Sequence, residues 1–163
     1  MLNLIHYILI ALAFNLIMFL FAYKFKTDKL TDLSYALTFL FLILLGFFMN
    51  SYSEFKLILF LMILLWSFRL GIFLFIRIRK IKKDRRFDGI RENFLKFFKF
   101  WFLQAIAVWV ILLPSIIIFG SSTRITLLSW IGFAIWFFGL TIETFSDFQK
   151  YQFNKNNKDN NWI

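Results

Sequence analysis

Long apolar runs, separated by short polar segments, dominate the pattern along this chain. Five runs are long enough to cross about 30 Å of hydrocarbon, a distance that takes about 20 helical residues. They cover residues 2–23, 33–49, 55–76, 98–119 and 125–145. Backbone polar groups in lipid must be satisfied within their own segment, so each run is predicted to be a helix. The pattern therefore predicts an all-α fold, a polytopic membrane helix bundle with about five transmembrane helices.

Composition leads to the same class of protein. The 163 residues are 61% hydrophobic and include 26 Phe, well above the usual apolar fraction of a soluble domain. We expect a single transmembrane helical domain over residues 1–153 and a polar, flexible tail over residues 154–163. The sequence has no cysteine, which excludes disulfides and Cys-ligated zinc, and its one histidine, His6, cannot form a His-based metal site alone. No metal is expected.

The positive charges are distributed unevenly between the polar segments. The segments at 24–32, 77–97 and from 150 onwards carry fifteen Lys or Arg residues, whereas the two intervening segments carry two. With five spans, the three basic segments fall on one side of the membrane, and the positive-inside rule makes that side cytoplasmic. We therefore expect an integral membrane protein, of the bacterial inner membrane type, with its N-terminus outside and its C-terminus in the cytoplasm. The net charge of +10 indicates contact with anionic lipid rather than with nucleic acid.

A few polar residues lie inside the predicted spans. Arg69 and Glu143 are expected at similar depths, about 12 Å from the basic end at 1.5 Å per residue, with Gln104 slightly shallower. One interpretation is a shared polar pocket, because ionisable groups in a membrane are functional candidates. The alternative is that Arg69 extends its side chain towards the interface while Gln104 and Glu143 make local structural hydrogen bonds. Asn15, Ser67 and His6 are interpreted as structural.

Two acidic positions near the end of the last span raise the same question. Glu143 and Asp147 are one helical turn apart, so they share a face and repel each other unless a partner or a wet cavity lies opposite. The basic segment "RIRKIKKDRRFDGIREN" at 77–93 also contains acids, Asp84 and Asp88. A topology signal that contacts lipid needs only positive charge. Arginine is suited to phosphate recognition, so a site for a phosphorylated cofactor is the competing interpretation.

Three stretches carry a resemblance to a known family. They read "WSFRLGIFLFIR", "DRRFDGIRENFLKFFKFWFLQAIAVWVILLP" and "GLTIETFSDFQKYQF". Together they resemble the steroid 5-alpha-reductase-like membrane proteins, and most nearly a bacterial branch of unknown function, over residues 34–153. The resemblance implies a helical bundle that uses NADPH to reduce a CH–CH double bond of a lipid-like substrate.

The resemblance also implies a set of cofactor-binding residues. They are Arg69, Arg85, Arg86, Asp88, Glu143 and Asp147. Trp66 stands where the steroid reductases carry a catalytic tyrosine, which departs from steroid-type chemistry and leaves the catalytic residues unassigned.

Members of that family continue into a Ser-Arg-His-Pro-Asn-Tyr-like segment and further helices. This sequence ends at Ile163, so the chain is expected to be an N-terminal part that is inactive alone. Two other hypotheses stay open. One is a membrane methyltransferase of the isoprenylcysteine type that uses S-adenosylmethionine, and the other is a non-enzymatic membrane remnant.

Overall fold

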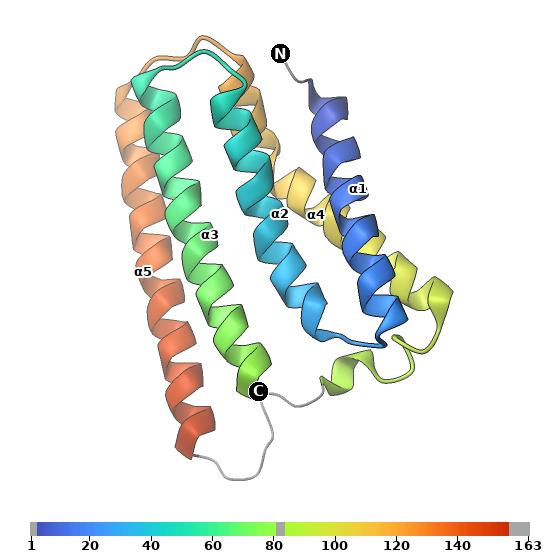
Figure 1. Ribbon diagram of the computed structural model, residues 1–163. Helices are drawn as coiled ribbons and strands as arrows, with labels where there is room; N and C mark the ends of the chain where they lie inside the picture. The colour runs from blue at the N-terminus through green and yellow to red at the C-terminus, as the bar shows by residue number, and fades with distance from the viewer. Residues whose placement is uncertain (1–2, 81–83, 157–163) are drawn as a thin grey trace. The chain divides into compact units, whose positions relative to one another are not determined.

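The computed structural model describes residues 3–80 and 84–156, and within these ranges the chain is entirely helical. The elements are α1 (Leu4–Lys24), α2 (Lys29–Phe48), α3 (Glu54–Lys80), the short 3-10 helix η1 (Arg85–Phe87), α4 (Phe94–Gly120) and α5 (Leu127–Asn156) (Figure 1). Each of the α-helices is long and apolar enough to cross a membrane. The predicted all-α class and five-span architecture are confirmed, and they are those of an integral membrane protein in a lipid bilayer.

The helices extend beyond the apolar runs at several ends. α5 continues to Asn156 and so includes residues 154–156, the first three positions of the predicted tail. At its start, α1 is capped by Asn3, whose side chain accepts a hydrogen bond from the backbone N–H of His6, while the His6 ring lies against the Asn3 backbone N–H. This reciprocal capping box satisfies N–H groups that a helix start otherwise leaves without partners. His6 is therefore structural, as predicted.

The chain divides into two compact units, residues 1–123 and residues 124–163, and each is described by itself. The first unit contains α1 to α4 and the second contains α5. Within the first unit, α1 packs mainly on α4 and α2 mainly on α3, while α2 also contacts α1 and α4. α2 is thus the central helix of the four.

The core of the first unit is built from apolar side chains of all four helices. Its buried members are Tyr7, Ala11, Phe39, Leu42, Ile43, Phe60, Ala105, Val108, Leu112, Ile116 and Phe119. At one point α2 and α4 come unusually close, because a Cβ atom added to Gly46 would lie only 2.6 Å from Cδ2 of Phe119. A small residue at such a contact is typical of membrane helix packing.

The α1–α2 and α3–α4 connections lie at the same end of the first unit, which we call the basic end (lower end in Figure 1). Direct contacts establish this, because Arg91 and the backbone N–H of Asp84 both bond to Asp28 of the α1–α2 turn. The prediction that these two basic segments share one side is therefore confirmed. That this side is cytoplasmic stays a prediction.

Candidate functional site

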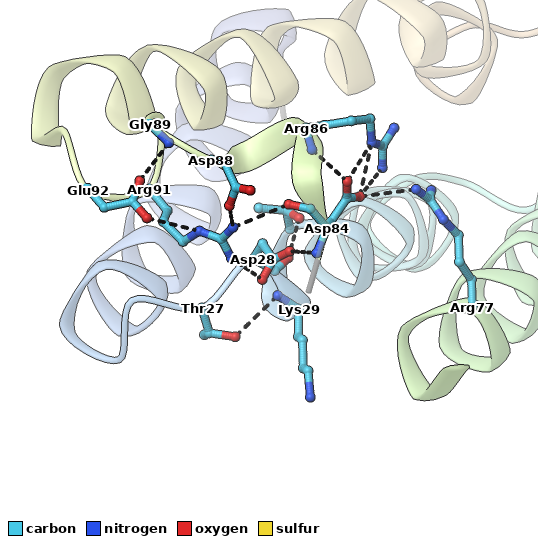
Figure 2. Close-up of polar contacts among 11 residues, drawn as sticks. Thr27, Asp28, Lys29, Arg77, Asp84, Arg86, Asp88, Gly89, Arg91 and Glu92 are labelled. Atoms are coloured by element: carbon cyan, nitrogen blue, oxygen red, sulfur yellow. Dashed lines mark hydrogen bonds and ion pairs between the residues drawn. The ribbon is translucent and has the colours of Figure 1, made fainter. Parts of the chain in front are cut away.

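A buried ion pair joins the two connections at the basic end. The guanidinium Nη1 of Arg91 lies 3.0 Å from Oδ1 of Asp28, and both side chains are less than a tenth exposed. The other carboxylate oxygen of Asp28 accepts the backbone N–H of Asp84 at 2.8 Å. One carboxylate thus holds both ends of the segment 84–93, and Figure 2 shows these contacts.

Arg91 contacts several acceptors. Besides Asp28, its guanidinium donates to the backbone carbonyl of Asp84 at 3.3 Å and to the carboxylate of Asp88, and it lies 3.4 Å from the carboxylate of Glu92. Its side chain is only 6% exposed. A charged group buried to this extent requires such pairing. The geometry makes Arg91 a structural residue of the loop.

Asp84 is the second centre of the cluster. Its carboxylate accepts Arg77 of α3 at 3.1 Å and the Nε of Arg86 at 3.0 Å (Figure 2). Arg77 also reaches Asp32 of α2 at 3.4 Å. Partial burial would raise the pKa of Asp84, but the hydrogen bonds and charge of Arg86 and the charge of Arg77 outweigh it, so that this pKa lies below its usual value. The acids within the basic segment therefore help to hold that segment in its folded conformation.

Apolar contacts also hold the same loop against α4. Phe87 of η1 is buried, and its ring packs edge-on against Phe100 at 4.9 Å and Phe97 at 6.3 Å between ring centroids. Gly89 follows with φ of 76°, a backbone conformation that glycine adopts without a steric penalty, and its N–H donates to Glu92 at 2.8 Å. The loop is thus a folded element that is docked on α4.

The structure brings two of the predicted cofactor residues into this cluster. Arg86 pairs with Asp84, and its side chain is 61% exposed. Asp88 accepts Arg91 and is exposed. The side chain of Arg85 lies outside the described residues.

The remaining three predicted residues lie on long helices. Arg69 is half-buried on α3, two helical turns before Arg77. Glu143 and Asp147 lie one turn apart on α5, in the second unit. The expected approach of Arg69 to Glu143 stays a prediction.

Gln104, which the sequence placed in a layer with Arg69 and Glu143, has its partners on α1 and α2. Its side-chain nitrogen donates to Asn15 Oδ1 at 3.1 Å, to Ser34 Oγ at 2.9 Å and to the backbone carbonyl of Thr31 at 3.3 Å. Asn15 in turn donates to Thr38 Oγ1 at 3.1 Å. All five side chains are buried, so for Gln104 the interpretation as a structural hydrogen-bonding residue fits the geometry.

Trp66 has a packing role in the described structure. Its ring meets Phe39 edge-on, with 4.9 Å between centroids and an interplanar angle of 88°. Such aromatic pairs stabilise a core beyond the area they bury.

The donor set fits a phosphorylated dinucleotide in part. Phosphate groups need accessible cationic donors, and Arg86 supplies an exposed guanidinium, whereas the guanidinium of Arg91 is buried. Asp88, Glu143 and Asp147 are unsuited to phosphate but suited to accept hydrogen bonds from ribose hydroxyls or a carboxamide.

The sequence did not identify Asp28 and Arg91 as residues of this cluster. The available signal was an acid in the otherwise basic stretch 24–29. The buried network also had a signal, since Thr31, Ser34 and Thr38 recur at helical spacing on one face of α2.

Residues 18–162 match a protein-family model described as "Protein of unknown function (DUF1295)". Comparison with curated proteins and with solved structures gave no match. The family match covers most of the chain, including the loop cluster, all of α2 to α5 and the last third of α1. This chain therefore belongs to the DUF1295 family.

Proposed function

We propose that this membrane protein binds NADPH at its basic end and serves in the reduction of a CH–CH double bond in a lipid-like substrate, as its resemblance to the steroid 5-alpha-reductase-like proteins implies. The single observation that carries the proposal is the position of Arg86. Its guanidinium is exposed beside a folded loop, and Asp84 restrains it through contacts of 3.1 Å and 3.0 Å to Nε.

The restraint on Arg86 favours recognition of a phosphate. A guanidinium held in place loses less side-chain entropy on binding than a free one. Its planar set of donors matches a phosphate group. Arg77 also pairs with Asp84, so α3 helps to hold the carboxylate that restrains Arg86.

The other predicted residues have distinct roles in this proposal. Asp88 accepts hydrogen bonds from the ribose hydroxyls, and Arg69 provides positive charge deeper in the membrane. NADPH, when bound, supplies a hydride to the activated double bond. Since NADPH is a cytoplasmic compound, the proposal also places the basic end in the cytoplasm and the N-terminus outside.

Equilibrium binding to the purified chain in nanodiscs tests this proposal. NADPH and S-adenosylmethionine are titrated separately, with NADPH fluorescence and calorimetry as readouts. We expect saturable binding of NADPH and none of S-adenosylmethionine. Binding of S-adenosylmethionine alone would favour the methyltransferase hypothesis, and binding of neither would contradict the proposal.

A further inference from the structure

An open groove lies between α1 and α4. Its volume is about 220 Å³. The residues that line it are Leu12, Ala13, Asn15, Leu16, Phe19, Phe98, Trp101, Phe102 and Ala105. Both helices have the hydropathy of membrane spans, so the groove lies at the depth of the lipid chains.

The lining of the groove favours an apolar occupant. Asn15 is its one amide, and that group already donates to the carbonyl of Ala11 at 2.9 Å and to Thr38 at 3.1 Å. The other polar side-chain group among the lining residues is the buried indole N–H of Trp101. Water in a cavity needs two to four polar partners, and this single N–H is too few. A hydrocarbon chain has no such requirement.

A row of phenyl rings leads from the groove to the basic end. Phe102, Phe98 and Phe94 recur every four residues along α4, and consecutive rings are stacked with 6.2 Å between centroids. At the end of the row, Phe94 meets Tyr23 of α1 edge-on at 5.3 Å. The apolar surface is therefore continuous from the groove to the first turn of α4.

Exposed lysines lie next to residues of this row. Lys24 follows Tyr23 on α1, and Lys99 follows Phe98 on α4. In the part of the chain that the structure describes, neither lysine pairs with an acid. Positive charge at the membrane surface attracts anionic headgroups.

We propose that this groove is a binding site for an anionic phospholipid of the bilayer. One acyl chain lies in the groove and along the phenyl row, and the headgroup phosphate lies near Lys24 and Lys99. Charge complementarity and the apolar lining select this occupant together. The site is independent of the proposed NADPH site, whose residues lie on the loop and on other helices.

Native mass spectrometry of the purified chain tests the proposal, with phosphatidylglycerol and phosphatidylcholine of equal acyl length as probes. Ala13→Trp fills the groove from its exposed rim, and Ile17→Trp places the same side chain on an exposed position of α1 that does not line the groove. Lys24→Gln with Lys99→Gln removes the headgroup contacts. The pair Lys26→Gln and Lys29→Gln removes equal charge from the α1–α2 turn and the first residue of α2.

We expect tighter retention of phosphatidylglycerol by the unmodified chain, a loss of that retention in Ala13→Trp and no loss in Ile17→Trp. The double variant at 24 and 99 should weaken the preference for phosphatidylglycerol roughly fivefold per lysine, and the double variant at 26 and 29 much less. Circular dichroism verifies that each variant is folded. Retention by Ala13→Trp equal to that of the unmodified chain would overturn the groove assignment. Equal retention of the two lipids, or of neither, would overturn the proposal as well.

Discussion

Arg91 and Asp28 form a 3.0 Å ion pair across 63 residues of sequence, between the loop that precedes α4 and the turn that precedes α2. The same carboxylate accepts the backbone N–H of Asp84. One acid of the α1–α2 turn therefore fixes both the start and the end of the segment that presents Arg86. The account of the candidate site depends on this pair.

Removing one partner of the pair should release the loop. A buried ion left without its partner costs about 3–5 kcal/mol, so Asp28→Asn and Arg91→Gln should each lower the free energy of loop opening by about that amount. Hydrogen exchange of the amides in 84–93 measures this directly. The control is Glu92→Gln, which removes a half-exposed acid from the same guanidinium and should cost less than about 1 kcal/mol.

The double variant of Asp28 and Arg91 should cost less than the sum of the two single variants, because no buried charge is then left alone. Additive effects of the two substitutions would contradict a direct interaction.

The loop should lose stability in acid through Asp84. The pKa of Asp84 is lowered in the folded protein from its ordinary value of 3.8, so the ionised carboxylate stabilises the loop at neutral pH. This contribution is lost as the pH falls through the lowered pKa. We expect the protection of amides 84–93, corrected for the intrinsic pH dependence of exchange, to fall below about pH 4. Asp84→Asn should reduce protection at neutral pH and abolish the acid transition; an unchanged transition in this variant would assign it to another group.

The Gln104 network should contribute to the stability of the bundle. Gln104→Leu leaves the acceptors on Asn15, Thr31 and Ser34 without this donor, and we expect a loss of about 1–2 kcal/mol in the free energy of unfolding. Unfolding in mixed micelles provides the measurement. Gln152→Leu, at an exposed position of α5, is the matched control and should change stability by no more than about 0.5 kcal/mol. Equal effects of the two substitutions would mean that the network adds nothing specific.

The close contact between α2 and α4 should not tolerate a methyl group. In Gly46→Ala, the new Cβ would lie 2.6 Å from the Phe119 ring, which is itself buried and has little room to move. Overpacking of this kind costs about 1–3 kcal/mol. Gly120→Ala is the control, because a Cβ there meets no atom within 4 Å. Thermal unfolding that is equal in the two variants would contradict the packing described for α2 and α4.

The helices were predictable from sequence because lipid permits few alternatives. An apolar run of about 20 residues has to be helical in the membrane, and positive charge marks the connections that share a side. Helix ends were less predictable. α5 continues into residues 154–156 because outside the hydrocarbon nothing in the apolar pattern marks where a helix stops.

The candidate site was predictable in its residue types but less so in its pairings. Asp84 and Asp88 stood out in the sequence because a signal for membrane topology needs only positive charge. Their partners could not be predicted, because these depend on which turns meet at the basic end. Asp28 is 63 residues from Arg91, and no local spacing connects them. Gln104 was recognised as a polar residue inside a span, but its neighbours follow from the packing of α4 against α1 and α2.

The affinity of NADPH relative to NADH, measured for the unmodified chain and for Arg86→Gln, tests the central claim most directly. The two dinucleotides differ by one phosphate, and a charge-assisted hydrogen bond to such a group is worth about 1.5–3 kcal/mol. We predict that the unmodified chain prefers NADPH by at least about tenfold, that Arg86→Gln loses this preference, and that Lys29→Gln, which removes an exposed charge from the α1–α2 turn, keeps it. A preference for NADPH that is undiminished in Arg86→Gln, or no preference in the unmodified chain, would contradict the account.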